Sequence, residues 1–283
     1  MSLGGILTAI VTPFDGDGRV NEHAAVRLMH HCLENGSDGL VIAGTTGEGA
    51  TLSDDEKARL WELAVVECAD ATVIAGTGTN DTAHSVHLTE KATEAGVDAV
   101  LVVTPYYNKP NRRGIKEHFR AVAAATDKPV VAYNIPSRCV VDIPNDLLRE
   151  LAADIPNVSA VKQARFEDIE PIEGMDLLAG NDDKLAETLD KGGTGGILVA
   201  SHLVGREMRR MIDEPDARWE VHESLRDLFK TLIVAPNPTP VKAALNMIGV
   251  EAGTLRLPMV EASEEEAAVV REALERHGLL STV

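Results

Sequence analysis

Aromatic residues are scarce in this sequence, at 3% of its 283 residues, so the position of each tyrosine is informative. All three tyrosines, Tyr106, Tyr107 and Tyr133, stand at or just after the ends of short apolar runs. Tyrosines that only fill a core are expected to scatter along a chain. Core packing is the alternative for any single tyrosine, but the shared placement favours proton transfer at a common site.

Cysteine is also rare, and its spacing excludes a disulfide framework. Cys32, Cys68 and Cys139 are odd in number, stand far apart and form no CxxC pair, which is typical of reduced thiols in the cytosol. No secretory leader pattern opens the sequence, and no apolar run has the length of a membrane span. We therefore expect a cytoplasmic protein without membrane contact.

Positive charge is in deficit. The sequence has 45 acidic and 27 basic residues, which gives a formal net charge of -18. A field of this sign repels nucleic acid phosphates and anionic membrane surfaces, so we expect neither as a partner. A small anionic substrate would need positive charge within its own site to overcome this field.

Eight apolar runs of strand length alternate with segments of helical periodicity, which predicts a (β/α)8 barrel over residues 1–212. The runs lie at residues 6–11, 39–43, 72–75, 99–103, 130–133, 158–161, 176–179 and 196–200. A short helix is expected after the sixth run, and the SDDE sequence at 53–56 predicts a capping box. Three further helical segments without a strand predict a C-terminal helical region, residues 213–283, packed on the barrel.

The sixth apolar run leads into a lysine. Side chains alternate along a strand, so Val158, Ala160 and Lys162 are expected on one face. If that face is the barrel interior, burial lowers the pKa of the Lys162 amine, and the neutral amine can attack a carbonyl carbon. The alternative is a lysine that reaches water from a strand end.

Polar side chains gather at the predicted carboxyl ends of the other strands, where barrel enzymes hold their catalytic groups. In chain order these ends carry Thr45, Thr46, Thr77, Asn80, Tyr106, Tyr107, Tyr133, Arg138, Lys162, Gly180 and Ile197. Hydroxyls, phenols, one guanidinium and one lysine suit a carbonyl substrate that bears a carboxylate. The GTTGEG sequence at 44–49 is either a tight turn or a carboxylate site of backbone N–H groups and hydroxyls, and Arg138 is either a carboxylate ligand or an exposed cation.

A metal site is the weaker interpretation of the remaining polar clusters. His84 and His87, with Asp81 and Glu90, have helical spacing but no third group of ligands elsewhere in the sequence. We therefore expect a solvated helix face and no bound metal.

Six motifs together resemble one known family. They are GTTGE at 44–48, VIAGTG at 73–78, TPYYN at 104–108, YNIPSR at 133–138, VK at 161–162 and NPTPVK at 237–242. The sequence resembles the dihydrodipicolinate synthase family of pyruvate-dependent class I aldolases from residue 7 to residue 258. This resemblance implies a lyase of lysine biosynthesis that condenses pyruvate with aspartate semialdehyde through an imine on Lys162, without another cofactor.

The resemblance also implies a role for each site residue. Thr45 and Thr46 would hold the pyruvate carboxylate, and Arg138 the carboxylate of the aldehyde. Tyr133 would be the general acid and base, linked through the Thr46 hydroxyl to Tyr107 of a neighbouring subunit. The Gly180 and Ile197 carbonyls would line the same pocket, and the enzyme would be a homotetramer built as a dimer of dimers.

The sequence departs from the family pattern beside the expected pocket. Cys139-Val140 and the QARF sequence at 163–166 replace the usual residues, which leaves open a 2-keto-3-deoxy sugar acid aldolase, an N-acetylneuraminate lyase or a related dehydratase. A barrel retained for binding without catalysis is a third possibility. Asp54, Lys57 and His84 differ from the lysine-binding residues of feedback-regulated members, so we expect no strong lysine inhibition.

Overall fold

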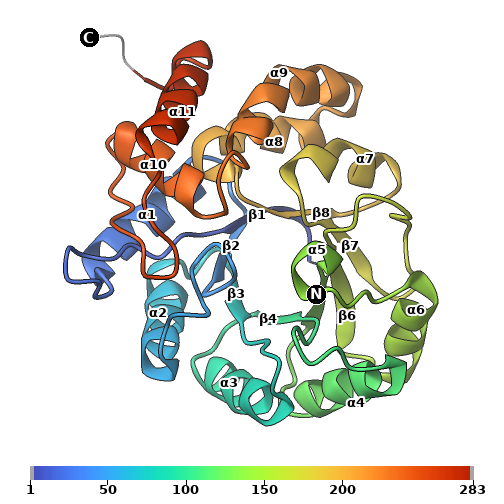
Figure 1. Cartoon of the computed structure of the whole chain (residues 1–283). Helices are drawn as coiled ribbons and strands as arrows, with labels where there is room; N and C mark the ends of the chain where they lie inside the picture. The colour runs from blue at the N-terminus through green and yellow to red at the C-terminus, as the bar shows by residue number, and fades with distance from the viewer. Residues whose placement is uncertain (1–2, 281–283) are drawn as a thin grey trace.

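The computed structural model describes residues 3–280, in which eight parallel strands form a closed barrel in sequence order (Figure 1). The strands are β1 Gly5–Ala9, β2 Gly39–Ile42, β3 Thr72–Gly76, β4 Ala99–Val103, β5 Val130–Asn134, β6 Val158–Gln163, β7 Asp176–Ala179 and β8 Gly195–Leu198. Strand β1 pairs with both β2 and β8, which closes the sheet. The predicted (β/α)8 barrel is confirmed.

Helices surround the barrel, and several begin at the polar side chains that the sequence offers. They are α1 Glu22–Glu34, α2 Asp54–Glu67, α3 Thr82–Glu94, α4 Arg112–Ala123, α5 Pro136–Cys139, α6 Asn145–Asp154, α7 Leu185–Asp190 and α8 Ser201–Asp213. The predicted capping box is present, because the Ser53 hydroxyl accepts from the Glu56 amide and the Glu56 carboxylate accepts from the Ser53 amide. No helix within residues 3–280 is both long and apolar enough to cross a membrane.

The core has two layers separated by the sheet. One side chain in two along each strand fills the barrel interior, as at Leu7, Val41, Ile74, Leu101, Val131, Leu178 and Ile197. The alternate side chains pack outward against the helices. The interior layer is entirely buried, so a polar side chain that joins it is desolvated.

Strand β6 breaks the simple alternation expected for it. Val158 pairs with Val130 but Ala160 pairs with Val131, so Ser159 is an extra residue that forms an irregularity in the ladder. Val158 consequently packs in the outer layer, whereas Ala160 lies inside. The expected common face of Val158 and Lys162 is therefore wrong, although Lys162 does share the interior with Ala160.

The connection between β6 and β7 is irregular, and the short helix expected there is absent from residues 164–175. Pro171 has no N–H and disfavours a helical conformation at the residue before it. Asp168 has a positive φ of 53°, which also interrupts a helix. Ile169 and Ile172, each 3% exposed, fasten the connection to the core instead.

Three helices follow α8 along the chain: α9 Arg218–Thr231, α10 Thr239–Met247 and α11 Glu264–Arg276. Figure 1 shows them together on one side of the barrel, where α9 lies along α8 and α11 lies against α9 and α10. Helix α8 itself packs against β1 and ends at Asp213. The division of the chain at residue 212 stays a prediction.

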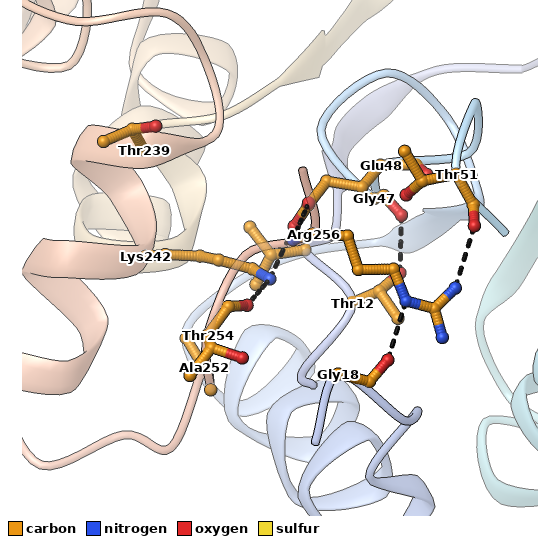
Figure 2. A network of polar contacts seen from close by, with 12 residues as sticks. Thr12, Gly18, Gly47, Glu48, Thr51, Thr239, Lys242, Ala252, Thr254 and Arg256 are labelled. Carbon is orange, nitrogen blue, oxygen red and sulfur yellow. Dashed lines mark hydrogen bonds and ion pairs between the residues drawn. The ribbon is translucent and has the colours of Figure 1, made fainter. Parts of the chain in front are cut away.

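A buried ion pair ties the C-terminal helical region to the loop after β2 (Figure 2). Lys242 Nζ lies 2.6 Å from Glu48 Oε1, and the two side chains are 1% and 2% exposed. The ammonium also donates to the Thr254 carbonyl at 2.6 Å and lies 4.5 Å from the centre of the Phe14 ring. Glu48 Oε2 accepts from the Arg256 amide at 3.0 Å. Both oxygens of the Glu48 carboxylate thus bind groups of the C-terminal region.

Arg256 reinforces this connection and also lies against Phe14. Its guanidinium carbon lies 4.3 Å from the centre of the Phe14 ring. The guanidinium donates to the Gly18 and Thr51 carbonyls, each at 2.8 Å (Figure 2), and it forms an ion pair with Glu56. One arginine therefore joins the C-terminal region to the first two loops of the barrel.

Replacing Lys242 by methionine should cost about 3–5 kcal/mol of unfolding free energy, because Glu48 would be left as an uncompensated buried charge. Denaturant unfolding measures this loss. The same substitution at Lys191, whose ion pair with Glu187 is exposed, should cost less than about 1 kcal/mol. Adding Glu48→Gln to Lys242→Met should recover part of the loss. Equal effects at Lys242 and Lys191 would contradict this account.

Candidate active site

A cavity of about 960 Å³ lies at the carboxyl ends of β2 to β5. Its wall includes Thr45, Tyr107, Tyr133, Arg138 and Asn237, four of which the sequence predicts as site residues. The structure thus brings together side chains from three barrel loops and from the segment between α9 and α10. A volume of this size accommodates small organic substrates.

Lys162 lies in the barrel interior, as predicted. It is 5% exposed, stands beside Tyr133 in the β5–β6 register, and its Nζ is 4.2 Å from the centre of the Tyr133 ring. Burial lowers the pKa of Lys162 to about 7, the charge of Asp182 opposes this shift, and the charge of Arg138 adds to it. A large share of the Lys162 amine is therefore neutral near pH 7 and able to attack a carbonyl.

Tyr133 is the second buried titratable group of the site. It is 5% exposed, and burial raises its pKa to about 12, while the charge of Arg138 and a hydrogen bond from the Thr45 side chain act in the opposite direction. The phenol is therefore protonated near neutral pH and can donate a proton to a group formed at Lys162.

The two threonines of the β2 loop have different partners, which corrects one expectation. The side chain that bonds to Tyr133 is Thr45, so the expected link through the Thr46 hydroxyl is wrong. Thr46, 3% exposed, instead accepts a hydrogen bond from Asn237 Nδ2 at 2.9 Å. Consecutive residues of a loop point in different directions, and sequence spacing alone does not say which of two adjacent threonines faces the phenol.

Tyr107 projects away from the core of its own barrel. Its side chain is 88% exposed and its φ is 69°, in the left-handed region that few residues other than glycine adopt. The neighbouring Asn108 side chain donates to the Asn80 carbonyl at 2.8 Å and so fastens the loop to the one after β3. Tyr107 lines the cavity, but within this chain it is not packed against Tyr133.

Arg138 supplies positive charge to the cavity from the short helix α5. It lies on the cavity wall with Cys139 and Val140, the first of the two departures from the family pattern. Its charge lowers the pKa of both Lys162 and Tyr133. An anion in the cavity would therefore meet a favourable local field in spite of the acidic chain.

The second departure from the family pattern, the QARF sequence at 163–166, contributes Arg165 to polar contacts near the cavity. Arg165 Nε lies 3.4 Å from Asp142 Oδ1, and its Nη1 donates to Asn145 Oδ1 at 3.3 Å. With 16% of its side chain exposed, Arg165 joins the β6–β7 connection to the start of α6. Cys139 and Val140 are thus the replaced residues that contact the cavity.

Gly180 and Ile197 lie at the ends of β7 and β8. The Gly180 amide donates to the Gln163 carbonyl at 2.8 Å, and Ile197 is fully buried in the barrel interior. Their expected carbonyl contacts with a substrate stay predictions.

Two residues that the sequence analysis did not select take part in the site. Asp182 Oδ1 accepts from the Val199 and Ala200 amides at 2.9 and 3.0 Å. Burial raises the pKa of Asp182 to about 6, and its charge acts on Lys162. Asn237 is the other. Asp182 belongs to the GND sequence at 180–182, and Asn237 belongs to the NPTP sequence at 237–240. No spacing in the sequence predicts that Asn237 contacts a residue 191 positions earlier in the chain.

The histidines of α3 face Asp54 rather than Asp81 and Glu90. His84 Nε2 and His87 Nε2 lie 2.9 and 3.8 Å from the Asp54 carboxylate. No group of three or more metal-ligating side chains is present in the part of the chain that the structure describes.

A parallel barrel with a desolvated lysine beside a buried phenol defines a class of barrel enzymes that act through a lysine amine. Within that class, the chain belongs to the dihydrodipicolinate synthetase family, whose sequence model matches residues 2–277. The resemblance noted in the motifs is confirmed. The chain is therefore an enzyme of the lyase type, as its relatives are.

Curated relatives match this chain over nearly its full length. A 4-hydroxy-tetrahydrodipicolinate synthase from Bacillus subtilis (strain 168) is 44% identical over 280 residues, which cover 94% of this chain and 96% of that protein. A protein of the same name from Desulforamulus reducens is 41% identical and covers 99% of both chains. The solved dihydrodipicolinate synthase of Thermotoga maritima is 37% identical, with a TM-score of 0.95 over 99% of this chain and 100% of that one.

The depressed pKa of Lys162 should make wild-type stability rise with pH. An amine whose pKa is about 7 when folded and near 10.5 when unfolded opposes folding fully below pH 7, and this penalty disappears towards pH 10.5. Lys162→Met should therefore be more stable than wild type by on the order of 3 kcal/mol at pH 7, and by much less at pH 10. Denaturant unfolding at both pH values measures the difference.

The same substitution at Lys230, an exposed lysine of α9, provides the control. Its effect on the free energy of unfolding should be small and independent of pH. A Lys162→Met difference that does not change between pH 7 and pH 10 would show that Lys162 is not desolvated.

Proposed function

We propose that this enzyme is a 4-hydroxy-tetrahydrodipicolinate synthase that condenses pyruvate with L-aspartate 4-semialdehyde in the biosynthesis of lysine. The observation that carries the proposal is the desolvated Lys162 amine beside the protonated Tyr133 phenol. The names of full-length relatives at 41–44% identity support the choice of substrates.

The reaction begins with the neutral Lys162 amine. The amine attacks the keto carbon of pyruvate, water leaves, and an imine forms that stores the positive charge on nitrogen. Loss of a methyl proton converts the imine into an enamine, whose carbon attacks the aldehyde and forms the new C–C bond. Attack of the aldehyde's own amino group on the imine carbon then closes the ring and releases Lys162. No further cofactor is required, because the imine itself accepts the electron pair.

Tyr133 is the general acid and base of this sequence. Its ring centre lies 4.2 Å from Lys162 Nζ, and its phenol would protonate the departing hydroxyl and recover the proton afterwards. Thr45 bonds to Tyr133 and forms the next step of the proton path. Tyr107 of a neighbouring subunit would complete the path, and its 88% exposure supports this role in an assembly.

The carboxylates of the two substrates bind in different parts of the cavity. Thr46 and the backbone of its loop hold the carboxylate of pyruvate close to Lys162, while Arg138 binds that of the aldehyde. The exposed position of Arg138 on the cavity wall supports its contact with the second substrate, which enters after the imine has formed. The Gly180 and Ile197 carbonyls lie at the ends of neighbouring strands and would line the pyruvate end.

The proposal includes a homotetramer, built as a dimer of dimers, in the cytoplasm. Tyr107 in the left-handed region on an exposed loop supports an interface at the cavity mouth. The three cysteines are free and buried, which supports a reducing compartment.

Imine trapping tests the assignment of Lys162. Borohydride reduction in the presence of pyruvate should attach the substrate covalently to Lys162, as peptide mass mapping would show, and Lys162→Ala should lose turnover and trapping together. Lys57 is a matched internal control, since it is also buried and lines the cavity whose wall includes Tyr133 and Arg138. Trapping at Lys57, or normal turnover by Lys162→Ala, would reject the mechanism.

Arg138→Ala should affect the binding of aspartate semialdehyde much more than that of pyruvate. It should raise the KM for aspartate semialdehyde by on the order of 100-fold, because a charge-assisted contact is lost, and leave pyruvate trapping within about threefold of wild type. Steady-state kinetics and trapping measure the two effects.

Cleavage of 2-keto-3-deoxygluconate and N-acetylneuraminate should be weak in the wild-type enzyme. Efficient cleavage of either sugar acid, or equal loss of trapping in Arg138→Ala, would overturn the assignment.

A further inference from the structure

The C-terminal helical region contributes a side chain to the cavity beside the loop after β2. Asn237, in the segment between α9 and α10, lines the cavity and donates from Nδ2 to Thr46 Oγ1 at 2.9 Å. The bond spans 191 residues of sequence. It is therefore made only when the C-terminal region is docked against the β2 loop.

The direction of this hydrogen bond decides where the Thr46 proton points. A hydroxyl has one O–H to donate, whereas a carboxylate can only accept. When the Thr46 oxygen accepts from the Asn237 amide, its own O–H is left for an acceptor elsewhere. A donor that feeds into a hydroxyl also polarises it and strengthens the bond that the hydroxyl donates.

Both partners are fixed by the contacts around them. Thr12 Oγ1 donates to the Gly47 carbonyl at 2.7 Å, directly after Thr46, and Glu48 is held by the buried Lys242 (Figure 2). Lys242 lies on α10, five residues after Asn237. The ion pair between Lys242 and Glu48 thus joins the segment that carries the donor Asn237 to the loop that carries the acceptor Thr46.

The other end of the Asn237 amide gives an independent indication of function. Its Oδ1 is buried and has no hydrogen-bond partner within residues 3–280. A buried acceptor without a partner is unfavourable for folding, so asparagine carries a cost here that an apolar side chain of similar shape would avoid. Packing alone therefore does not account for an asparagine at this position.

We propose that Asn237 is a positioning residue that turns the Thr46 hydroxyl toward the carboxylate of pyruvate. Asn237 does not itself touch the reacting atoms. Through Asn237, a region outside the eight strands of the barrel would therefore affect the binding of pyruvate. The inference rests on the proposed function, because it assumes that pyruvate occupies the space between Thr46 and Lys162.

Two substitutions of Asn237 separate orientation from packing. Asn237→Ala removes the donor, so the KM for pyruvate should rise about 3- to 10-fold. Asn237→Asp keeps the shape but offers an acceptor, which would draw the Thr46 proton away from the substrate and place a negative charge near its carboxylate. Its KM for pyruvate should therefore rise more than that of Asn237→Ala. The KM for aspartate semialdehyde should change less than twofold in Asn237→Ala.

A purely structural role predicts the opposite order, because aspartate fills the space of asparagine and alanine does not. Asn246→Ala is the matched control, since Asn246 binds the Gly253 carbonyl and the Ala252 amide within the same region, away from Thr46. Its KM for pyruvate should equal that of wild type. A milder effect of Asn237→Asp than of Asn237→Ala, or an equal effect of Asn246→Ala, would overturn the inference.

A double-variant cycle tests whether Asn237 acts through Thr46. In a Thr46→Val background, Asn237→Ala should change the KM for pyruvate by less than about twofold, because the hydroxyl that it orients is gone. Full additivity would contradict the inference. Borohydride trapping of pyruvate on wild-type Lys162 is measured alongside. Absence of trapping there would refute the proposed function itself, whereas normal trapping with unchanged Asn237 variants would refute only the role of Asn237.

Discussion

Desolvation of one lysine is the constraint on which the arrangement of the site depends. A closed barrel keeps water from Lys162, and the same burial that makes its amine reactive opposes folding. The surrounding groups limit this cost without restoring a fully charged amine. The Tyr133 ring lies against the ammonium, and the Asp182 carboxylate, held by two backbone amides, acts on it from the segment after β7. The reactivity of the Lys162 amine and its cost to folding therefore have one cause.

Three other cations of the chain differ in what they do. Lys242 and Arg256 are each neutralised by a carboxylate, Glu48 and Glu56, and they hold the architecture together. Arg138 instead acts on the two reactive groups: its charge adds to the lowering of the Lys162 pKa and opposes the rise of the Tyr133 pKa that burial causes. An acidic protein can thus bind a small anion, because a cation on the cavity wall supplies a local attraction that the net charge does not.

The barrel, the interior position of Lys162 and the role of the strand ends could be predicted, because alternation and helical periodicity are local properties of the sequence. The irregularity at Ser159 could not, since it depends on how β6 pairs with β5. The helix expected within 164–175 followed from the strand–helix repeat alone, which takes no account of Pro171. Which of Thr45 and Thr46 faces Tyr133, and the contact of Asn237 with Thr46, depend on tertiary contacts between distant segments. The sequence holds no periodic signal for such contacts.

The dependence of the β2 loop on Lys242 has a consequence for biosynthesis. Ribosomes make the amino-terminal end first, so all eight strands have left the ribosome before residue 242 is added to the chain. Until then Glu48 has no cation to neutralise it, and the loop that carries both threonines lacks the contacts that hold it in place. The β2 loop can therefore take up its final contacts only after Lys242 and Arg256 have been added, although the strand before it is among the first to be made.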